Sequence, residues 1–199
     1  MDQDCRVRRD LTVFQVGRFP LASGTLLRPY YMGKHVDRIC EIQAVLAKGP
    51  TELLRYLSAT TWPSAEQLDP ELGFSSDVLK MMAVLEAVFE EARKRFAPEM
   101  PSRLASTFAW PTLAVAERFK AEYLPTGTLH QCRVVEGAII ERDGGLLPPG
   151  IDLQAKSALA FQKELDATRL RAEAYWRGHQ PQDFPELLIV GTVMTIAAC

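Results

Sequence analysis

The order of strand-like and helix-like segments is the feature of this sequence that most constrains its fold. A run of β-branched and aromatic residues at 11–16 comes first, and helical patterns then fill most of the chain up to residue 96. Further strand-like and helix-like segments follow without strict alternation, which a doubly wound parallel sheet would require. The sequence therefore predicts an α+β fold with an antiparallel or split sheet. At 199 residues it predicts one domain, 1–199, with a helical insertion at about 36–96.

Residue alternation and turn residues locate the expected strands. We expect strands at 11–16, 25–29, 103–109, 128–135, 138–142 and 186–196. The last of them opens the longest apolar run, residues 187–199, which is shorter than the roughly 20 residues that cross a bilayer as a helix. This run is therefore interpreted as a buried strand, and no membrane partner is expected.

Apolar residues spaced three and four apart predict the helices. The clearest pattern covers 75–96, and a second long helix is expected from Asp152 to Arg177 with Gly178 just after its end. The helical residues 36–60 are interrupted at Gly49, with Thr51 expected to cap the second half. A short helix after Thr112, which is a suitable cap, completes the set.

Charge and cysteine content limit the class of protein. The formal net charge of -2 gives no basic excess of the kind that duplex-binding proteins usually show. The N-terminal residues contain no apolar segment typical of an export signal. The cysteines are far apart, with no Cys-x-x-Cys pair, which indicates free thiols in a reducing compartment. We therefore expect a cytoplasmic protein. The four cysteines are Cys5, Cys40, Cys132 and Cys199.

Several common catalytic motifs are absent from the sequence. It contains no GxGxxG or GxxxxGK[ST] phosphate-binding loop, no HExxH zinc motif and no GxSxG nucleophile motif. The histidines His35, His130 and His179 have no metal-ligand spacing, so no metal site is expected. His130 and Cys132 would share one face of a strand, but no third group is evident to orient them as a nucleophilic pair.

Three segments, taken in order, resemble motifs of a known superfamily. The first is 14–17 with the turn at 23–25 and the extended residues 27–31. The second is 101–109, and the third is 175–178 followed by 185–191. Together they resemble a group of uncharacterised bacterial proteins and, through these, the ADP-ribosyltransferase superfamily. That resemblance implies a split, mostly antiparallel sheet of ADP-ribosyltransferase type, which holds NAD between the motifs.

The resemblance also implies roles for individual residues. Glu186, which opens the last expected strand, matches the catalytic glutamate. Gln15 takes a place where the superfamily usually has His or Arg, so Arg18 or Arg28 would supply the missing charge. Position 184 is Phe, which departs from the Glu-x-Glu variant and makes arginine-directed transfer less favoured. The implied cofactor-binding residues are Gln15, Arg28, Tyr30, Tyr31, Ser106 and Thr107.

The function implied by the resemblance is cleavage of NAD, used as a substrate, with transfer of ADP-ribose to a protein or nucleic acid. Such an enzyme would act as a toxin or defence effector. One alternative is a non-catalytic binding module on the same fold, which Gln15 favours. Another is a partner protein of antitoxin or chaperone type. In that case Leu79, Val84 and Val88, which lie off the main apolar stripe, bury a partner helix, although a second helix of the same chain explains them equally well.

Overall fold

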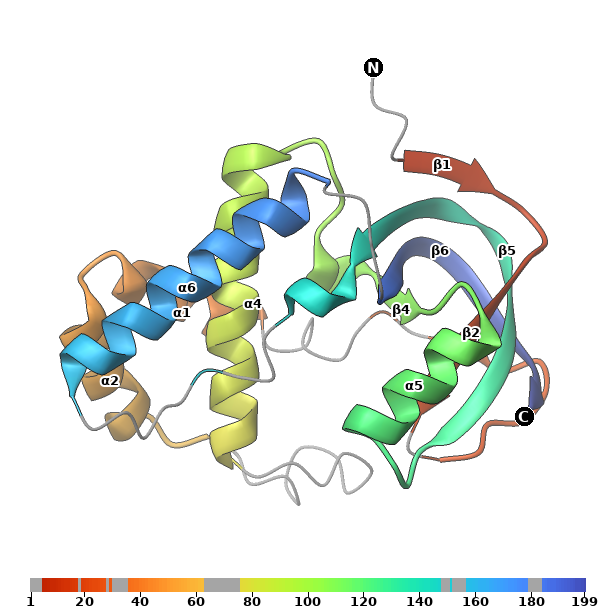
Figure 1. Cartoon of the computed structure of the whole chain (residues 1–199), viewed down its shortest axis with the longest axis horizontal. Coiled ribbons are helices and arrows are strands. Elements are labelled where there is room, and N and C mark those ends of the chain that lie inside the picture. Colours follow the sequence, from red (N-terminus) through yellow and green to blue (C-terminus); the bar gives the residue numbers. More distant parts are fainter. Residues whose placement is uncertain are drawn as a thin grey trace. The chain divides into compact units, whose positions relative to one another are not determined.

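The chain forms two compact units in a computed structural model. The structure describes residues 5–17, 19–27, 29, 36–62, 76–147, 151, 157–178 and 184–199. We call residues 1–33, 99–145 and 178–199 the sheet unit, and residues 34–98 and 146–177 the helical unit. Each unit is described by itself. Figure 1 labels the elements of both.

The sheet unit is built on one six-stranded sheet in which every strand pair is antiparallel. Its path is β1-β5-β6-β3, with β2 paired to β5 and β4 paired to β6. This arrangement confirms the α+β, mostly antiparallel prediction. The strands are β1 Cys5–Arg8, β2 Leu11–Gly17, β3 Leu26–Leu27, β4 Thr107–Ala109, β5 Thr128–Asp143 and β6 Pro185–Ala198.

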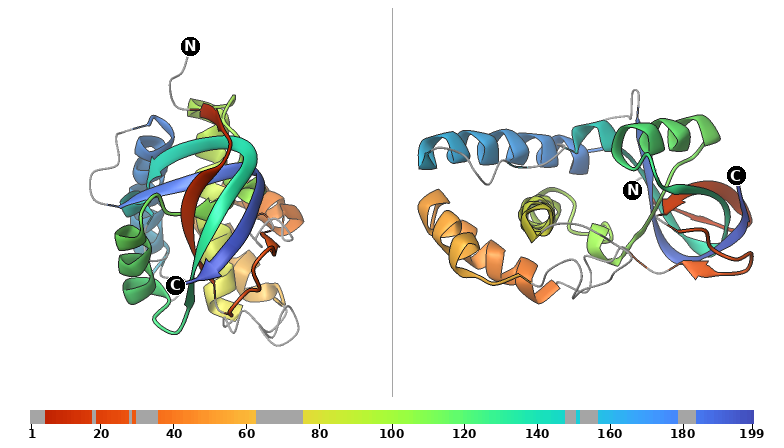
Figure 2. Two further views of the ribbon diagram at one scale, coloured as in Figure 1. Left: turned by 90° about the vertical axis from the view of Figure 1, so that its right-hand side faces the viewer. Right: turned by 90° about the horizontal axis from the view of Figure 1, so that it is seen from below.

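Four of these strands close into a ring. β5 pairs with β2 and β6, β6 pairs with β4, and β4 returns to β2 through two backbone hydrogen bonds. In that bridge Phe14 N donates to Trp110 O at 2.9 Å, and Trp110 N donates to Phe14 O at 2.7 Å. Figure 2 shows how strongly β5 and β6 curve. The inner face carries a buried apolar core of Val13, Ala109, Cys132, Val134, Ile139, Leu187, Ile189 and Val193.

The opposite face of β2 is covered by helix α5, Leu113–Tyr123. Thr112 caps this helix as expected, because its hydroxyl accepts a hydrogen bond from Val115 N at 3.3 Å. A second core, made by Val16, Trp110, Ala116 and Leu129, lies between the helix and the sheet.

Two expected strands, 128–135 and 138–142, are in fact one continuous strand, β5. The prediction of two strands was wrong, and Gly137, which lies between the two expected segments, is inside the strand. The register shifts between Val134 and Glu136, so the strand bends there without ending. Gly137 and its partner Gly191 approach closely, since a Cβ on Gly191 would lie 2.1 Å from Glu136 O. Gly191 also has a φ of 157°, which an L side chain rarely adopts.

Other boundaries also differ from expectation. The expected strand 103–109 begins with a short 3-10 helix, Arg103–Ala105, and only Thr107–Ala109 is extended. The last helix starts later than expected, because Ser157 rather than Asp152 caps it and Ser157 Oγ accepts a hydrogen bond from Ala160 N at 3.2 Å. Asp152 itself lies outside the described residues.

The helical unit contains α1 Val36–Leu46, α2 Pro50–Ala59, α4 Ser76–Phe96 and α6 Ala158–Trp176. The break at Gly49 is confirmed, but Gly49 is the N-cap of α2 and Thr51 lies inside the helix. Phe89 and Tyr175 meet edge to face at 5.3 Å between ring centroids, and Trp176 Nε1 donates to Phe89 O at 2.7 Å. None of the helices in the described ranges is long and apolar enough to cross a membrane.

The helical unit also buries the apolar residues that lie off the main stripe of α4. Leu79, Val84 and Val88 are at most 2% exposed. They belong to the interior of the unit that α1, α4 and α6 form. Packing within the chain therefore accounts for these side chains.

Candidate functional site

Glu186 is a buried carboxylate near the beginning of β6. The residue is 6% exposed, and its Oε1 accepts a hydrogen bond from Arg103 Nη1 in a buried ion pair. Arg103 is equally enclosed, at 5% exposed. A buried charge is costly unless it is paired, so each member of this pair depends on the other.

The chain places Arg103 by means of a short capped turn. Ser102 Oγ accepts from Leu104 N at 3.1 Å, which starts the 3-10 helix Arg103–Ala105. Ser106 closes this turn, since its hydroxyl donates to Ser102 O at 2.9 Å. The guanidinium of Arg103 then lies 4.6 Å from the centroid of the Phe108 ring, a favourable cation–π distance. The Pro-Ser-Arg segment thus positions a buried arginine.

A second arginine lies beside the same carboxylate. Arg142 is directly opposite Glu186 in the β5–β6 register and is 2% exposed. Residues opposite each other in an antiparallel pair have Cβ atoms roughly 5 Å apart. Arg142 Nη1 also donates to Glu141 O at 2.9 Å. The register thus brings a second buried arginine next to Glu186 in the sheet.

The sheet separates some of the residues expected to share a site. Side chains alternate between faces along a strand, so Glu186 and Leu188 lie on one face while Leu187 and Ile189 lie on the inner face. Thr107 is paired with Ile189 and therefore belongs to the inner face. Gln15 is two residues from Val13 on β2. Because Val13 belongs to the inner core, Gln15 also lies on that face. The structure brings Glu186 together with Arg103, and it places Thr107 and Gln15 on the other side of the sheet.

Gln15 has a neighbour that the sequence did not suggest. It is directly opposite His130 in the β2–β5 register, and His130 is 0% exposed. His130 Nε2 lies 3.1 Å from Phe19 O. Of the other expected cofactor-binding residues, Arg28, Tyr30 and Tyr31, together with Arg18, lie outside the described residues.

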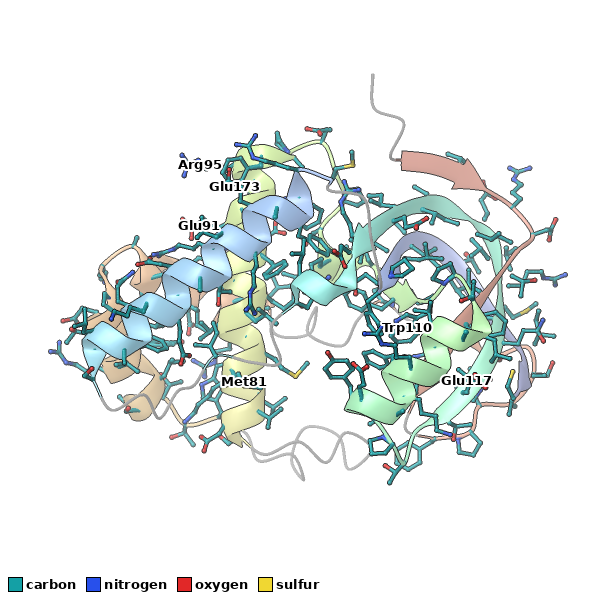
Figure 3. All side chains as sticks on the ribbon, in the orientation of Figure 1. Met81, Glu91, Arg95, Trp110, Glu117 and Glu173 are labelled. Carbon is teal, nitrogen blue, oxygen red and sulfur yellow. The ribbon has the colours of Figure 1, made fainter. Side chains whose placement is uncertain are left out.

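A row of aromatic rings follows α5 to the start of β6. Trp110 and Phe119 have centroids 4.1 Å apart, and Phe119 stacks on Tyr123 at 5.2 Å. Phe184, two residues before Glu186, lies 6.2 Å from Phe119, and Arg118 covers its ring at 5.2 Å. Figure 3 labels Trp110, which belongs to the core between the sheet and α5. The spacing of Phe119 and Tyr123, one helical turn apart, is the sequence signal for this row.

One hollow of the sheet unit lies away from Glu186, which is not among its lining residues. Its volume is about 530 Å³, and it lies between α5, the beginning of β5 and the last residue. Its lining is mainly apolar, with Glu117 and Lys120 as its charged members. Figure 3 labels Glu117 on α5. Among the described residues, no group of three or more His, Cys, Asp or Glu side chains is suited to hold a metal ion.

Cys132 has the properties of a core residue. Burial, with a smaller contribution from Cys199, raises the pKa of its thiol to about 12. Its Sγ lies 3.8 Å from His130 O, the backbone oxygen, and not against the imidazole. A thiol in this environment remains protonated at neutral pH and is a poor nucleophile. The structure thus agrees with the argument against a Cys132–His130 catalytic pair.

Comparison with known proteins gives a family but no activity. Residues 64–198 match the model of a family described as "Protein of unknown function (DUF2441)". The matched part includes Arg103, Arg142 and Glu186, whereas β2 and Gln15 precede it. The chain matches none of the curated proteins with which it was compared.

Proposed function

The chain belongs to the DUF2441 family, and we propose that it is an NAD-dependent ADP-ribosyltransferase whose catalytic carboxylate is Glu186. The observation that carries this proposal is the fixed position of Glu186. The side chain is 6% exposed and ion-paired with Arg103, so its charge and orientation are set before any ligand arrives. Electrostatic stabilisation of a transition state is strongest from such a preorganised charge in a site that excludes water.

The chemistry of NAD cleavage suits this carboxylate. Breaking the bond between nicotinamide and ribose develops positive charge on the ribose, as in glycoside cleavage. A carboxylate that faces this charge and accepts a hydrogen bond from a ribose hydroxyl stabilises the transition state more than the ground state. An ionised carboxylate has about four lone-pair positions and can accept several hydrogen bonds, of which Arg103 Nη1 supplies one at Oε1. Arg103 acts as a positioning residue in this proposal.

The products follow from the same chemistry. Nicotinamide leaves with the bonding electrons, and a nucleophile of the acceptor attacks the anomeric carbon of the ribose. The acceptor is a protein or a nucleic acid, as expected for a toxin or defence effector. The net charge of -2 gives no preference for a duplex acceptor.

A second function is favoured by a specific observation. The carboxylate of Glu186 is already ion-paired, and Gln15 and Thr107 lie on the opposite face of the sheet. These two features are expected of a non-catalytic module that binds a nucleotide or a partner protein on the same fold. In such a module the carboxylate of Glu186 contributes only to stability.

One experiment separates the two functions. The full chain is incubated with NAD labelled on its adenylate part and with cell extract, and nicotinamide release and label transfer are measured. We expect both signals from the wild type and their loss in Glu186→Gln. Glu136→Gln is a matched control on β5, because Glu136 forms an exposed ion pair with Arg9 at 3.3 Å. It should retain full activity.

The stability of the variants must be measured in parallel. Thermal unfolding with and without NAD shows whether the folded protein binds it, because a ligand specific for the native state raises its stability. A thermal shift without nicotinamide release would contradict the transferase proposal and support the non-catalytic module. If Glu186→Gln fails to fold, the double variant Arg103→Gln/Glu186→Gln removes both charges together and provides the inactive comparison. Activity retained in a folded Glu186 variant would overturn the transferase proposal.

A further inference from the structure

We propose that the outer face of α5 and the hollow beside it bind a second copy of this chain, so that two sheet units form a symmetric dimer. The contact is directed by Glu117 and Lys120, two residues of opposite charge that line the hollow. Its formation does not depend on the proposed transfer reaction, because Glu186 is not part of it.

One side of α5 carries a stripe of residues at spacings of four, three and four positions, which places them on one face of a helix. The members of this stripe are Leu113, Glu117, Lys120 and Leu124. The side of the helix that packs on the sheet carries Val115, Ala116 and Phe119 instead. Leu113, at the beginning of the stripe, is 40% exposed.

The hollow of about 530 Å³ lies beside this stripe. Residues of α5 line it on one side, and Pro125, Leu129 and Cys199 line the remainder. Cys199 N donates to Leu129 O at 2.8 Å, which holds the residue after β6 against the beginning of β5. The hollow therefore has defined walls, and the side chains of a second helix can pack into it.

The two charged residues at the centre of the stripe have no ion pair or side-chain hydrogen bond within the part of the chain that the structure describes. Other charged residues of α5 differ, since Arg118 Nε pairs with Glu122 Oε1 at 2.9 Å. Glu117, labelled in Figure 3, is one helical turn from Lys120. The stripe thus offers one acid and one base to a partner.

Opposite charges at these two positions favour an antiparallel pairing of two α5 helices. In a two-fold symmetric dimer, residue i of one copy contacts residue j of the other, and j contacts i. With the axis between positions 118 and 119, Glu117 faces Lys120 of the second copy, and the reverse contact forms as well. Leu113 then meets Leu124 of the second copy beside its hollow. A parallel pairing would place like charges opposite each other, which is unfavourable.

Sedimentation equilibrium of the full chain in reducing buffer tests whether the dimer forms. The contact is centred on a helix of 11 residues, and small interfaces of this kind are weak. We therefore expect a dissociation constant between about 1 μM and 1 mM. A wild-type protein that is still monomeric at about 1 mM would overturn the proposal.

Charge reversal tests the pairing itself. Glu117→Lys and Lys120→Glu should each weaken the dimer roughly tenfold or more, because two attractive contacts become repulsive. An equimolar mixture of these two variants should associate as the wild type does, because each supplies the charge that the other lacks. A folding defect could not be rescued by mixing. Glu122→Lys is the matched control, since it reverses a charge of the same helix outside the stripe, and it should leave the dissociation constant unchanged.

The thiols locate the contact. Cys199 lines the hollow, whereas Cys40 is exposed on α1 in the helical unit. As the protein concentration rises, labelling of Cys199 by a thiol reagent should slow in proportion to the remaining monomer, while labelling of Cys40 stays constant. Association that leaves Cys199 unprotected, or that persists in both charge-reversal variants, would overturn the proposal. Glu186→Gln should dimerise as the wild type does, so this test is independent of the transferase test.

Discussion

The sheet unit and the helical unit differ in what they bury. Nine polar or charged residues are buried among the described residues, and seven of them lie in the sheet unit. The two in the helical unit are Glu86 and Thr168, and Thr168 donates its hydroxyl to Glu164 O at 2.8 Å in its own helix. The seven in the sheet unit are Arg103, Ser106, Thr107, His130, Arg142, Glu186 and Thr195.

This difference favours the sheet unit as the place of the proposed site. Burying a charge or an unsatisfied acceptor destabilises a fold, so such groups are kept where they serve specificity or function. The helical unit has an apolar interior with aromatic contacts such as Phe89 with Tyr175, and many of its ion pairs are exposed. The sheet unit, by contrast, buries most of the polar and charged side chains, including the pair in the proposed site.

The largest expected effect concerns the thiols. Cys40 in the helical unit and Cys199 are exposed, whereas Cys132 is buried. We expect a thiol reagent to label Cys132 at least roughly a thousandfold more slowly than Cys40, because labelling requires unfolding. Mass spectrometry after timed labelling measures both rates. Comparable rates at neutral pH would show that the inner face of the sheet opens readily.

The raised pKa of Cys132 also sets the sign of a pH effect. Its folded pKa of about 12 lies above the value of about 8.5 for an unfolded cysteine. The stability from keeping this thiol neutral is complete below about pH 8.5 and is lost as pH rises towards 12. Cys132→Ala should reduce the loss of stability across this window, measured by urea unfolding.

The next effect tests the buried ion pair. Glu186→Ala should lower the free energy of unfolding by about 3–5 kcal/mol, because it leaves the charge of Arg103 buried without this carboxylate. The double variant Arg103→Met/Glu186→Met should recover most of the loss. Urea unfolding measures both. A loss below about 1 kcal/mol for Glu186→Ala, the value of an exposed pair, would contradict the distinction between the units.

A smaller effect is expected in the interior of the helical unit. Trp176→Phe removes the hydrogen bond from Nε1 to Phe89 O and leaves a small cavity. We expect a loss of about 1–3 kcal/mol in the free energy of unfolding. The proposed transferase activity should be kept at a temperature where the variant is folded. Loss of activity in a folded Trp176→Phe would show that the helical unit also contributes to the site.

The smallest effect is expected at the surface of the helical unit. Glu52→Gln breaks an exposed ion pair with Arg55, whose charged atoms are 2.7 Å apart. Exposed pairs of this kind contribute at most about 1 kcal/mol. The urea midpoint should therefore change little. A loss of unfolding free energy as large as that of Glu186→Ala would show that the two units do not differ in how much their ion pairs contribute to stability.

The local structure of this chain could be predicted from its sequence where local rules decide it. The apolar spacing of α4, the cap at Thr112 and the break at Gly49 involve neighbours within one or two helical turns. The same holds for β2 and β6, whose residue types are typical of strands. The irregular order of these segments was also sufficient to predict an α+β fold with a mostly antiparallel sheet.

Only the tertiary structure decided which residues meet. Arg103 and Glu186 are 83 positions apart, and Gln15 and His130 are brought together by the register of β2 on β5. The residue pattern also predicted two strands where the structure has one, β5. A glycine can end a strand in one context and permit close strand packing in another. The face on which a side chain lies depends on register, and a shift of one residue reverses it. The sequence by itself indicated most of the helices and strands and suggested Glu186 as a candidate, because local patterns carry that information. The tertiary structure decided that Glu186 pairs with Arg103 and lies on the opposite face of the sheet from Gln15.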